Sequence, residues 1–305
     1  MRILLFGRNG QVGWELQRSV APLGEVISLG REARGPLRGD FLDLAGLRET
    51  VRSVRPDVIV NAAAYTDVDL AESRRDEARI VNAEAPALLA SEARELGALL
   101  VHYSTEYVFS GEGSRPWRED DCMRPLNVYG RAKLDGDRAI EASGCRYLIF
   151  RTSWVYAARG KNFLRTILRL AKHREVLRVV DDQVGAPTAA ELVADVTAQV
   201  LRALFDDPRR AGTYHLAPKG ETSWYEYARF ALDRAMAAGW RLKATPERVE
   251  PISSEAFGGV AERPRNSRLD CALLARVFGL DLPDWRFGVE RAVEEMRESL
   301  DGGLV

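Results

Sequence analysis

Tyr129 and Lys133 lie four positions apart in the segment Tyr-Gly-Arg-Ala-Lys. On a helix, that spacing places a phenol and an amine on one face, within reach of each other. A free tyrosine has a pKa of about 10 and is a poor acid or base at neutral pH unless a nearby cation stabilises its phenolate. The pair is therefore predicted to transfer protons, with Lys133 as the cation. Tyrosine and lysine also pair on ordinary amphipathic helices, so the prediction depends on the surrounding motifs.

Hydroxyl groups follow the strand predicted over residues 99–103, in the run Ser104-Thr105-Glu106. Ligands bind at the carboxyl edge of a parallel sheet, which is where this run lies. Thr105 can donate a hydrogen bond to a carbonyl oxygen and stabilise the negative charge that develops there. A serine and a threonine that merely end a strand are the alternative.

A glycine loop, Gly7-x-x-Gly10-x-x-Gly13, joins the first predicted strand to the first predicted helix. Glycines there allow a tight turn and a close approach of the backbone to a pyrophosphate, which the helix N-terminus also attracts. A plain structural turn is the alternative. After another strand come Asn61 and three alanines at 62–64, where small side chains leave room for a cofactor or simply pack.

The end of the second strand reads Gly30-Arg31-Glu32. An acidic residue at this place binds the ribose 2′-OH of NAD, whereas an arginine accommodates the 2′-phosphate of NADP. The cofactor is therefore predicted to be NADPH or NADH, with a modest preference for NADPH because of Arg31. Asp40 and Phe41 suit the adenine edge, although an aspartate beside a glycine also forms ordinary turns.

Short apolar runs alternate with helix-length segments in the first half of the chain. Strands are predicted over residues 2–6, 26–29, 58–61, 99–104 and 147–151, and helices over 12–20, 43–53, 82–96 and 128–143. This alternation predicts an α/β fold with a doubly wound parallel sheet of the Rossmann type. Residues 1–155 are expected to form the NAD(P)-binding domain, and 156–305 a smaller α+β substrate domain, with parts of 175–210 packing on the first.

The composition excludes several classes of partner. Forty-four basic residues nearly balance 45 acidic ones among 305, so no excess of positive charge indicates a nucleic acid or a membrane surface. No stretch of about 18 apolar residues occurs. The three cysteines are scattered singly and indicate neither disulfides nor a zinc site. A cytoplasmic enzyme with a small-molecule substrate is the resulting expectation.

Five further segments help to identify the protein family that the chain resembles. They are 10–17 (GQVGWELQ), 129–130 (YG), 150–156 (FRTSWVY), 182–188 (DQVGAPT) and 263–269 (RPRNSRL). With the glycine loop, Asn61-Ala-Ala-Ala, the Thr105 strand end and the Tyr129–Lys133 pair, they resemble the extended short-chain dehydrogenase/reductase family. Within that family the chain is similar, over nearly its whole length, to the dTDP-4-dehydrorhamnose reductases.

The resemblance implies a role for each matching residue. Tyr129 would donate a proton, Lys133 would lower its pKa and hold the nicotinamide ribose, and Thr105, Glu106 and Trp154 would contact the sugar. The family usually has aspartate where this chain has Glu106. The cofactor-contact segments would be matched by Gly7, Gly10, Gln11, Val12, Gly13, Arg31, Asp40, Phe41, Ala62, Ala63, Ala64, Tyr103, Tyr129 and Lys133.

The resemblance also implies a structural magnesium ion. Some bacterial members form homodimers through Mg²⁺ held by glutamates, and Glu15, Glu191 and Glu295 lie at matching positions. A hard cation prefers such oxygen ligands. Each of these residues taken alone is equally a charged side chain on a solvated helix face.

The activity implied is NAD(P)H-dependent reduction of the C4 ketone of dTDP-4-dehydro-L-rhamnose, the last step toward dTDP-L-rhamnose for lipopolysaccharide or O-antigen. The C-terminal domain would bind the dTDP group, and arginine forks match phosphate oxygens. Candidate contacts are Arg263, Arg265, Asn266 and Ser267, with solvated surface charge as the alternative. Two other functions stay open: a nucleotide-sugar epimerase or dehydratase, and a non-catalytic subunit resembling the regulatory chain of methionine adenosyltransferase.

Overall fold

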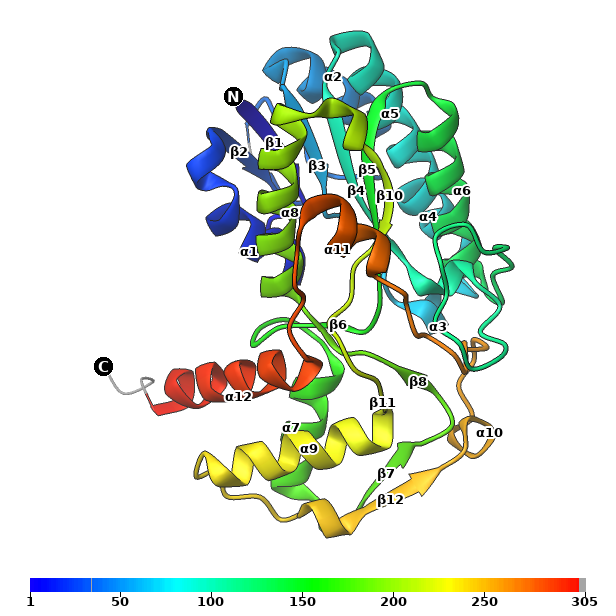
Figure 1. Cartoon of the computed structure of the whole chain (residues 1–305), viewed down its shortest axis with the longest axis vertical. Helices are drawn as coiled ribbons and strands as arrows, with labels where there is room; N and C mark the ends of the chain where they lie inside the picture. Colours follow the sequence, from blue (N-terminus) through cyan, green and yellow to red (C-terminus); the bar gives the residue numbers. More distant parts are fainter. Residues whose placement is uncertain (34, 302–305) are drawn as a thin grey trace.

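In the computed structural model of the protein, six parallel strands form the central sheet (Figure 1). The structure describes residues 1–33 and 35–301. The strands lie in the order β10-β5-β4-β3-β1-β2. Their bounds are β1 Arg2–Phe6, β2 Glu25–Leu29, β3 Val58–Asn61, β4 Leu99–Thr105, β5 Arg146–Thr152 and β10 Gly212–His215. The chain reverses its direction of winding between β1 and β3, which is where open α/β sheets bind ligands.

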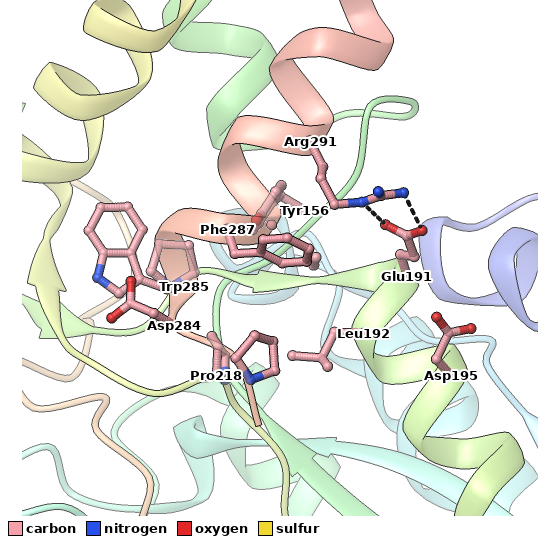
Figure 2. Close-up of a pocket in the computed structure, with 13 residues that line it drawn as sticks. Tyr156, Glu191, Leu192, Asp195, Pro218, Asp284, Trp285, Phe287 and Arg291 are labelled. Carbon is pink, nitrogen blue, oxygen red and sulfur yellow. Dashed lines mark hydrogen bonds and ion pairs between the residues drawn. The ribbon is translucent and has the colours of Figure 1, made fainter. Parts of the chain in front are cut away.

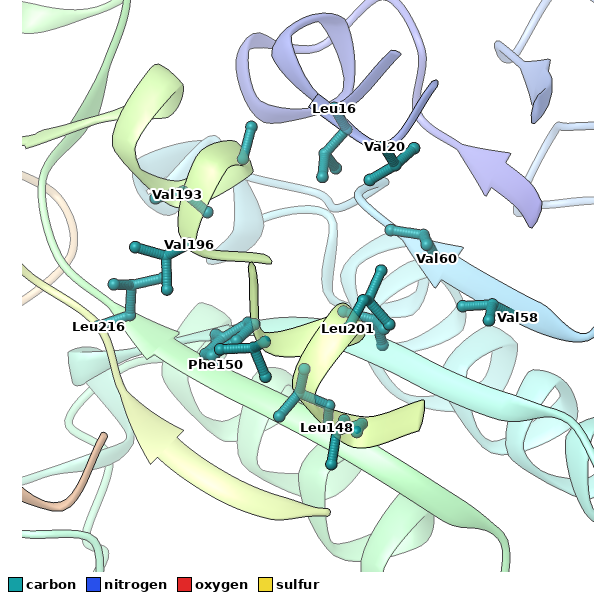
Figure 3. Close-up of a cluster of buried hydrophobic side chains, with 14 of the residues drawn as sticks. Leu16, Val20, Val58, Val60, Leu148, Phe150, Val193, Val196, Leu201 and Leu216 are labelled. Atoms are coloured by element: carbon teal, nitrogen blue, oxygen red, sulfur yellow. The ribbon is translucent and has the colours of Figure 1, made fainter. Parts of the chain in front are cut away.

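Side chains of the sheet alternate between two hydrophobic clusters. Ile3 and Leu5 of β1 contact one cluster, shown in part in Figure 3, whereas Leu4 and Phe6 contact the other. The covering helices are α1 Gln11–Ser19 and α8 Ala190–Asp206 on the first face, and α2 Leu44–Val54, α5 Ala85–Leu96 and α6 Val128–Ala142 on the second. Each fully buried aliphatic side chain contributes about 1.5–3 kcal/mol. The predicted doubly wound parallel sheet is confirmed.

A separate core lies below the sheet in Figure 1, among α7, α9 and α12. Three two-stranded sheets accompany it, which pair β7 with β12, β8 with β11 and β6 with β9. The elements of this part are β6 Val155–Tyr156, α7 Phe163–His173, β7 Leu177–Val180, β8 Val184–Gly185, β9 Thr188–Ala189, β11 Thr222–Ser223, α9 Trp224–Ala237, β12 Val249–Ile252, α10 Ser254–Phe257 and α12 Trp285–Asp301. This mixture of helices and short strands agrees with the α+β prediction.

The chain returns to the first core after entering the second. Helix α8 packs along α1, and β10 extends the sheet beside β5. Helix α11 (Ala272–Phe278) adds Leu274 to the first hydrophobic cluster. The first packing unit thus includes segments well beyond residue 155, and the domain boundary near that residue stays a prediction.

Helix α6, which carries Tyr129 and Lys133, is fixed at its start by Asn127. The Asn127 side chain accepts a hydrogen bond from Gly130 N at 2.8 Å and donates one to Glu262 O at 2.8 Å. A Cβ at Gly130 would lie 2.3 Å from Tyr107 O, so only glycine allows the helix to approach the end of β4 this closely. These contacts set the position of the helix face that points toward the strand ends.

The remaining elements are short. They are α3 Val68–Ala71, α4 Arg75–Arg79, the π-helix η2 Ile80–Glu84, and the 3₁₀ turns η1 Ala21–Leu23, η3 Glu106–Val108, η4 Pro208–Arg210 and η5 Pro246–Arg248. The helix predicted over 82–96 therefore begins as a π-helix and continues as α5. Among residues 1–33 and 35–301, no helix combines the length and apolar character needed to cross a membrane.

Candidate active site

Lys133 is buried at the junction of α6 and β4, with 1% of its surface exposed. Its Nζ donates a hydrogen bond to Tyr103 O at 2.6 Å and lies 3.0 Å from His102 Nε2. Burial lowers the pKa of Lys133 to about 8, because an ammonium loses solvation there, and the charge of Asp137 opposes the shift. The amine can therefore exchange a proton near neutral pH.

Tyr129 lies one helical turn before Lys133, with its ring edge-on to Tyr107 at 5.5 Å between centroids. Burial raises the pKa of Tyr129, the charge of Glu106 adds to the shift, and a hydrogen bond with Thr105 opposes it. The predicted lowering of this pKa by Lys133 does not appear among these influences. A phenol that keeps its proton is suited to give it to a developing oxyanion.

Thr105 ends β4 beside Tyr129, and Glu106 follows it at the start of η3. The Thr105 hydroxyl donates to Glu106 Oε2 at 2.8 Å and accepts from Tyr107 N at 3.2 Å. Burial raises the pKa of Glu106 to about 7, against hydrogen bonds from Thr105 and Ser267. Glu106 Oε1 is buried and has no hydrogen-bond partner among the described residues. A buried oxygen of this kind indicates a polar group that a ligand would supply.

The glycine loop forms a cradle at the carboxyl end of β1. A Cβ at Gly7 would lie 2.6 Å from the carbonyl carbon of Ala62, and one at Gly13 would lie 2.1 Å from Gly7 O. Gly10 is the N-cap of α1, and in the part of the chain that the structure describes no side chain caps this helix and no acidic residue lies in its first turn. Open N–H groups at a helix N-terminus fit a pyrophosphate.

Gln11 and Val12, at the start of α1, have different surroundings. Gln11 Oε1 accepts a hydrogen bond from Asn162 Nδ2 at 2.7 Å, so the glycine loop is tied to the segment that follows β6. Val12 is half-buried and packs against the first hydrophobic cluster. Gln11 therefore connects the cradle to the second part of the chain.

The residues that follow β2 form a polar turn over a buried ring. Arg31 Nε lies 3.6 Å from Asp40 Oδ2 in an exposed ion pair. Asp40 also accepts from Leu42 N at 3.1 Å, as a turn-forming aspartate does. Phe41 is buried in the core, edge-on to Phe6 at 5.5 Å. Their predicted contacts with the cofactor stay predictions.

The alanines after β3 adjoin the glycine cradle through Ala62, with Ala63 half-buried and Ala64 exposed. Tyr103 contributes its backbone carbonyl to the site, where it holds Lys133. Its hydroxyl lies within hydrogen-bonding distance of Thr197 Oγ1 on α8, at 2.8 Å. The side chain of Tyr103 is thus anchored to the helix that covers the sheet.

Trp154 lies between the two cores in a left-handed backbone conformation, with φ at 49°. Its ring stacks on Trp224 of α9 at 3.7 Å between centroids. A Cβ at Gly185 would lie 2.9 Å from the Trp154 ring, so that glycine makes room for it. A strained residue of this kind commonly marks a functional site. The sugar contact of Trp154 stays a prediction.

The predicted phosphate contacts are largely engaged within the chain. Arg263 Nη2 pairs with Asp69 Oδ2 at 2.5 Å, and the buried Asn266 amide donates to Arg115 O at 2.8 Å. Ser267 is buried beside Glu106, and Arg265 is exposed. Arg263 thus joins the second part of the chain to α3.

The three predicted magnesium ligands lie near one another, and arginines pair with two of them, Glu15 and Glu191. Figure 2 shows Glu191 with both carboxylate oxygens bound to Arg291, at 3.0 and 3.2 Å, beside a pocket of about 300 Å³ between α8 and α12. Burial raises the pKa of Glu15, and the charges of Glu295 and Glu191 add to this shift. Among the described residues, no three His, Cys, Asp or Glu side chains are grouped closely enough to hold a metal ion, and the magnesium site stays a prediction.

The sequence interpretation overlooked the charged groups behind Lys133. Asp137 is fully buried and accepts from Ser104 Oγ at 2.7 Å and from Arg151 Nε at 3.4 Å. Asp137 lies four residues after Lys133, so the spacing argument that placed Tyr129 and Lys133 on one helix face also predicts Asp137 beside Lys133. His102 gave no such signal, because it lies inside an apolar strand.

Comparisons with known proteins show relatives that match nearly the whole chain. The family model described as RmlD substrate binding domain matches residues 1–298. The dTDP-4-dehydrorhamnose reductase of Salmonella typhimurium is 51% identical over 296 residues, which cover 97% of this chain and 98% of that protein.

Solved structures show the same similarity. The dTDP-4-dehydrorhamnose reductase of Bacillus anthracis, in complex with NADP, is 34% identical with a TM-score of 0.84, and the match covers 96% of this chain and 99% of that one. The dTDP-glucose 4,6-dehydratase of Streptomyces venezuelae, 22% identical with a TM-score of 0.77 over 99% of this chain and 98% of that one, shares the fold. The chain therefore belongs to the dTDP-4-dehydrorhamnose reductase family.

Proposed function

We propose that this chain reduces the C4 ketone of dTDP-4-dehydro-L-rhamnose to give dTDP-L-rhamnose, with NAD(P)H as the reductant. The observation that carries this assignment is the phenol of Tyr129 beside Thr105, together with the buried Glu106 Oε1, which has no hydrogen-bond partner within residues 1–33 and 35–301. The 51% identity to the Salmonella typhimurium reductase supports the choice of substrate.

Gly7, Gly10 and Gly13 would hold the pyrophosphate of the cofactor, and Lys133 its nicotinamide ribose. The nicotinamide, when bound, supplies the hydride. NADPH is slightly favoured because Arg31 follows β2, and the Bacillus anthracis relative in complex with NADP supports this choice. The exposed position of Arg31 leaves its guanidinium within reach of solvent and of a 2′-phosphate.

As negative charge grows on the ketone oxygen, Tyr129 gives its proton to that oxygen and Thr105 turns its hydroxyl toward it. Glu106 then has both carboxylate oxygens available to accept hydrogen bonds from sugar hydroxyls. Trp154, held against Trp224, covers the sugar and excludes water from the site.

The organisation of the chain follows from this assignment. Residues 1–155, with α8, β10 and α11, would form the cofactor-binding unit, and the second core would bind the dTDP group. A homodimer held by Mg²⁺ would need carboxylates from two copies, which sedimentation with and without EDTA tests. The cytoplasmic location expected from the sequence stays a prediction that cell fractionation tests.

The decisive experiment follows oxidation of NADPH and of NADH optically with dTDP-4-dehydro-L-rhamnose, for the wild type and for Tyr129→Phe. We expect stoichiometric cofactor consumption, and a loss of about 10²–10⁴ in kcat for the variant, because one general acid contributes that much. Conversion of a nucleotide sugar without net cofactor consumption would favour an epimerase or dehydratase. Absence of turnover in the wild type would favour the regulatory-subunit alternative.

A further inference from the structure

A buried histidine lies directly behind the catalytic pair. His102 on β4 is 1% exposed, and its ring nitrogens face two different partners. Nδ1 lies 2.9 Å from Asn61 Nδ2 at the end of β3, and Nε2 lies 3.0 Å from Lys133 Nζ on α6. The ring thus connects the end of one strand with the lysine of the Tyr129–Lys133 pair.

Asn61 determines which ring nitrogen carries the proton. Its Oδ1 accepts a hydrogen bond from Ala63 N at 3.1 Å, so its NH₂ group is the one that faces His102. An NH₂ group only donates, and Nδ1 must therefore accept. A neutral imidazole with an accepting Nδ1 carries its hydrogen on Nε2. A charged imidazolium would oppose two donors, and burial also lowers the pKa of His102 well below its usual range.

The Nε2–H group is directed at Lys133 Nζ. An ammonium has three donors and no lone pair, so it cannot accept from Nε2–H, whereas a neutral amine can. Tyr103 O accepts equally well from either form of Lys133. Among these contacts, the one with His102 alone distinguishes the two protonation states, and it favours the amine.

The groups around this pair have opposing effects on the protonation of Lys133. Asp137 from α6 acts on Lys133 and lies near His102, and Arg151 from β5 pairs with Asp137. Tyr129 on α6 is influenced by the charges of Asp137 and of Glu106, which follows β4. Asp137 Oδ1 lies 3.9 Å from His102 Nε2 and has no hydrogen-bond partner among the described residues. Asp137 favours the ammonium of Lys133, whereas His102 opposes it, so the lysine is balanced between its two forms.

We propose that His102 is a positioning residue, held by Asn61 as the Nε2–H tautomer, that stabilises the neutral amine of Lys133 and so lets Lys133 return a proton to Tyr129. This inference rests on the proposed reductase function. The Tyr129 O–H bond breaks as its proton joins the ketone oxygen. A Lys133 N–H bond then breaks and the phenol O–H bond forms again, and the new lone pair on Nζ accepts from His102. Solvent restores the proton of Lys133 between turnovers.

The first test needs no turnover. The chain contains three histidines, His102, His173 and His215, so ¹⁵N NMR of the imidazole nitrogens resolves few signals, and His102→Gln identifies the one of interest. We expect the Nε2–H tautomer throughout about pH 6 to 9. An Nδ1–H tautomer or an imidazolium would overturn the proposal, and this result stands whether or not the substrate assignment is right.

The second test inverts the tautomer with the isosteric variant Asn61→Asp. One carboxylate oxygen still accepts from Ala63 N and the other accepts from Nδ1–H, which leaves the Nε2 lone pair facing Lys133. The alkaline limb of the kcat profile, expected near the Lys133 pKa of about 8, should move up by about one pH unit. On that limb kcat would rise about tenfold.

The matched control is the double variant Asn61→Asp/His102→Leu, which keeps the new charge and removes the ring. Measured against the single variant His102→Leu, which lacks the ring in the same way, the double variant should show no further shift of the alkaline limb. If the same shift persists, the charge acts without the ring, and the proposal is wrong. Should the double variant fail to fold, the NMR measurement on the wild type still decides the tautomer.

Discussion

Two carboxylates in this protein pair with arginines, one in a buried site and the other in an exposed one. Asp137 and Arg151 lie behind the active site with side chains 0% and 1% exposed, at 3.4 Å. Glu191 and Arg291 lie on the outer face of α8 and α12 with side chains 40% and 54% exposed, at 3.0 Å (Figure 2). The exposed pair has the shorter distance, yet we expect the buried pair to have the larger effect on stability.

The difference teaches that burial, rather than distance, sets the energy of a charged pair here. Removing Asp137 from water raises its pKa even though Arg151 and Lys133 lower it. A buried pair of charges holds its geometry because loss of either partner leaves the other uncompensated. Water and salt screen the exposed pair, so its partners can separate at little cost.

The largest effect should follow from breaking the buried pair. We expect Arg151→Leu to lower the free energy of unfolding by about 3–5 kcal/mol, because Asp137 then stays buried without its arginine. Urea denaturation measures this change. The double variant Arg151→Leu/Asp137→Leu should recover part of the loss, and a double variant that is less stable than the single one would contradict this explanation.

A second effect concerns Glu106, whose pKa of about 7 lies above its ordinary value of 4.5 because the carboxyl is buried. A raised pKa stabilises the fold below about pH 4.5, and this stabilisation is lost as the pH rises through 7. We therefore expect Glu106→Gln to gain about 3 kcal/mol relative to the wild type between pH 4.5 and pH 8. Denaturation of the wild type and the variant at both pH values measures the gain, and an equal stability difference at the two pH values would contradict it.

The sequence predicted local features better than features that depend on contacts between distant segments. Continuous apolar runs placed β1 and β3 correctly, and the four-residue spacing placed Tyr129 and Lys133 on one helix face. The pKa of Tyr129 was predicted in the wrong direction, because its burial comes from segments distant in sequence. The short strand β10 was also missed, because four residues at the edge of a sheet carry little pattern.

The smallest effect belongs to the exposed pair. We expect Glu191→Gln to change the free energy of unfolding by less than about 1 kcal/mol, because a solvated ion pair gains little Coulomb energy. The change should shrink further at high salt, since the Debye length falls to about 3 Å at 1 M. Denaturation of the wild type and the variant at low and high salt measures both quantities. A loss as large as that of Arg151→Leu, unaffected by salt, would mean that Glu191 is covered in solution, and sedimentation would then show whether a second copy covers it.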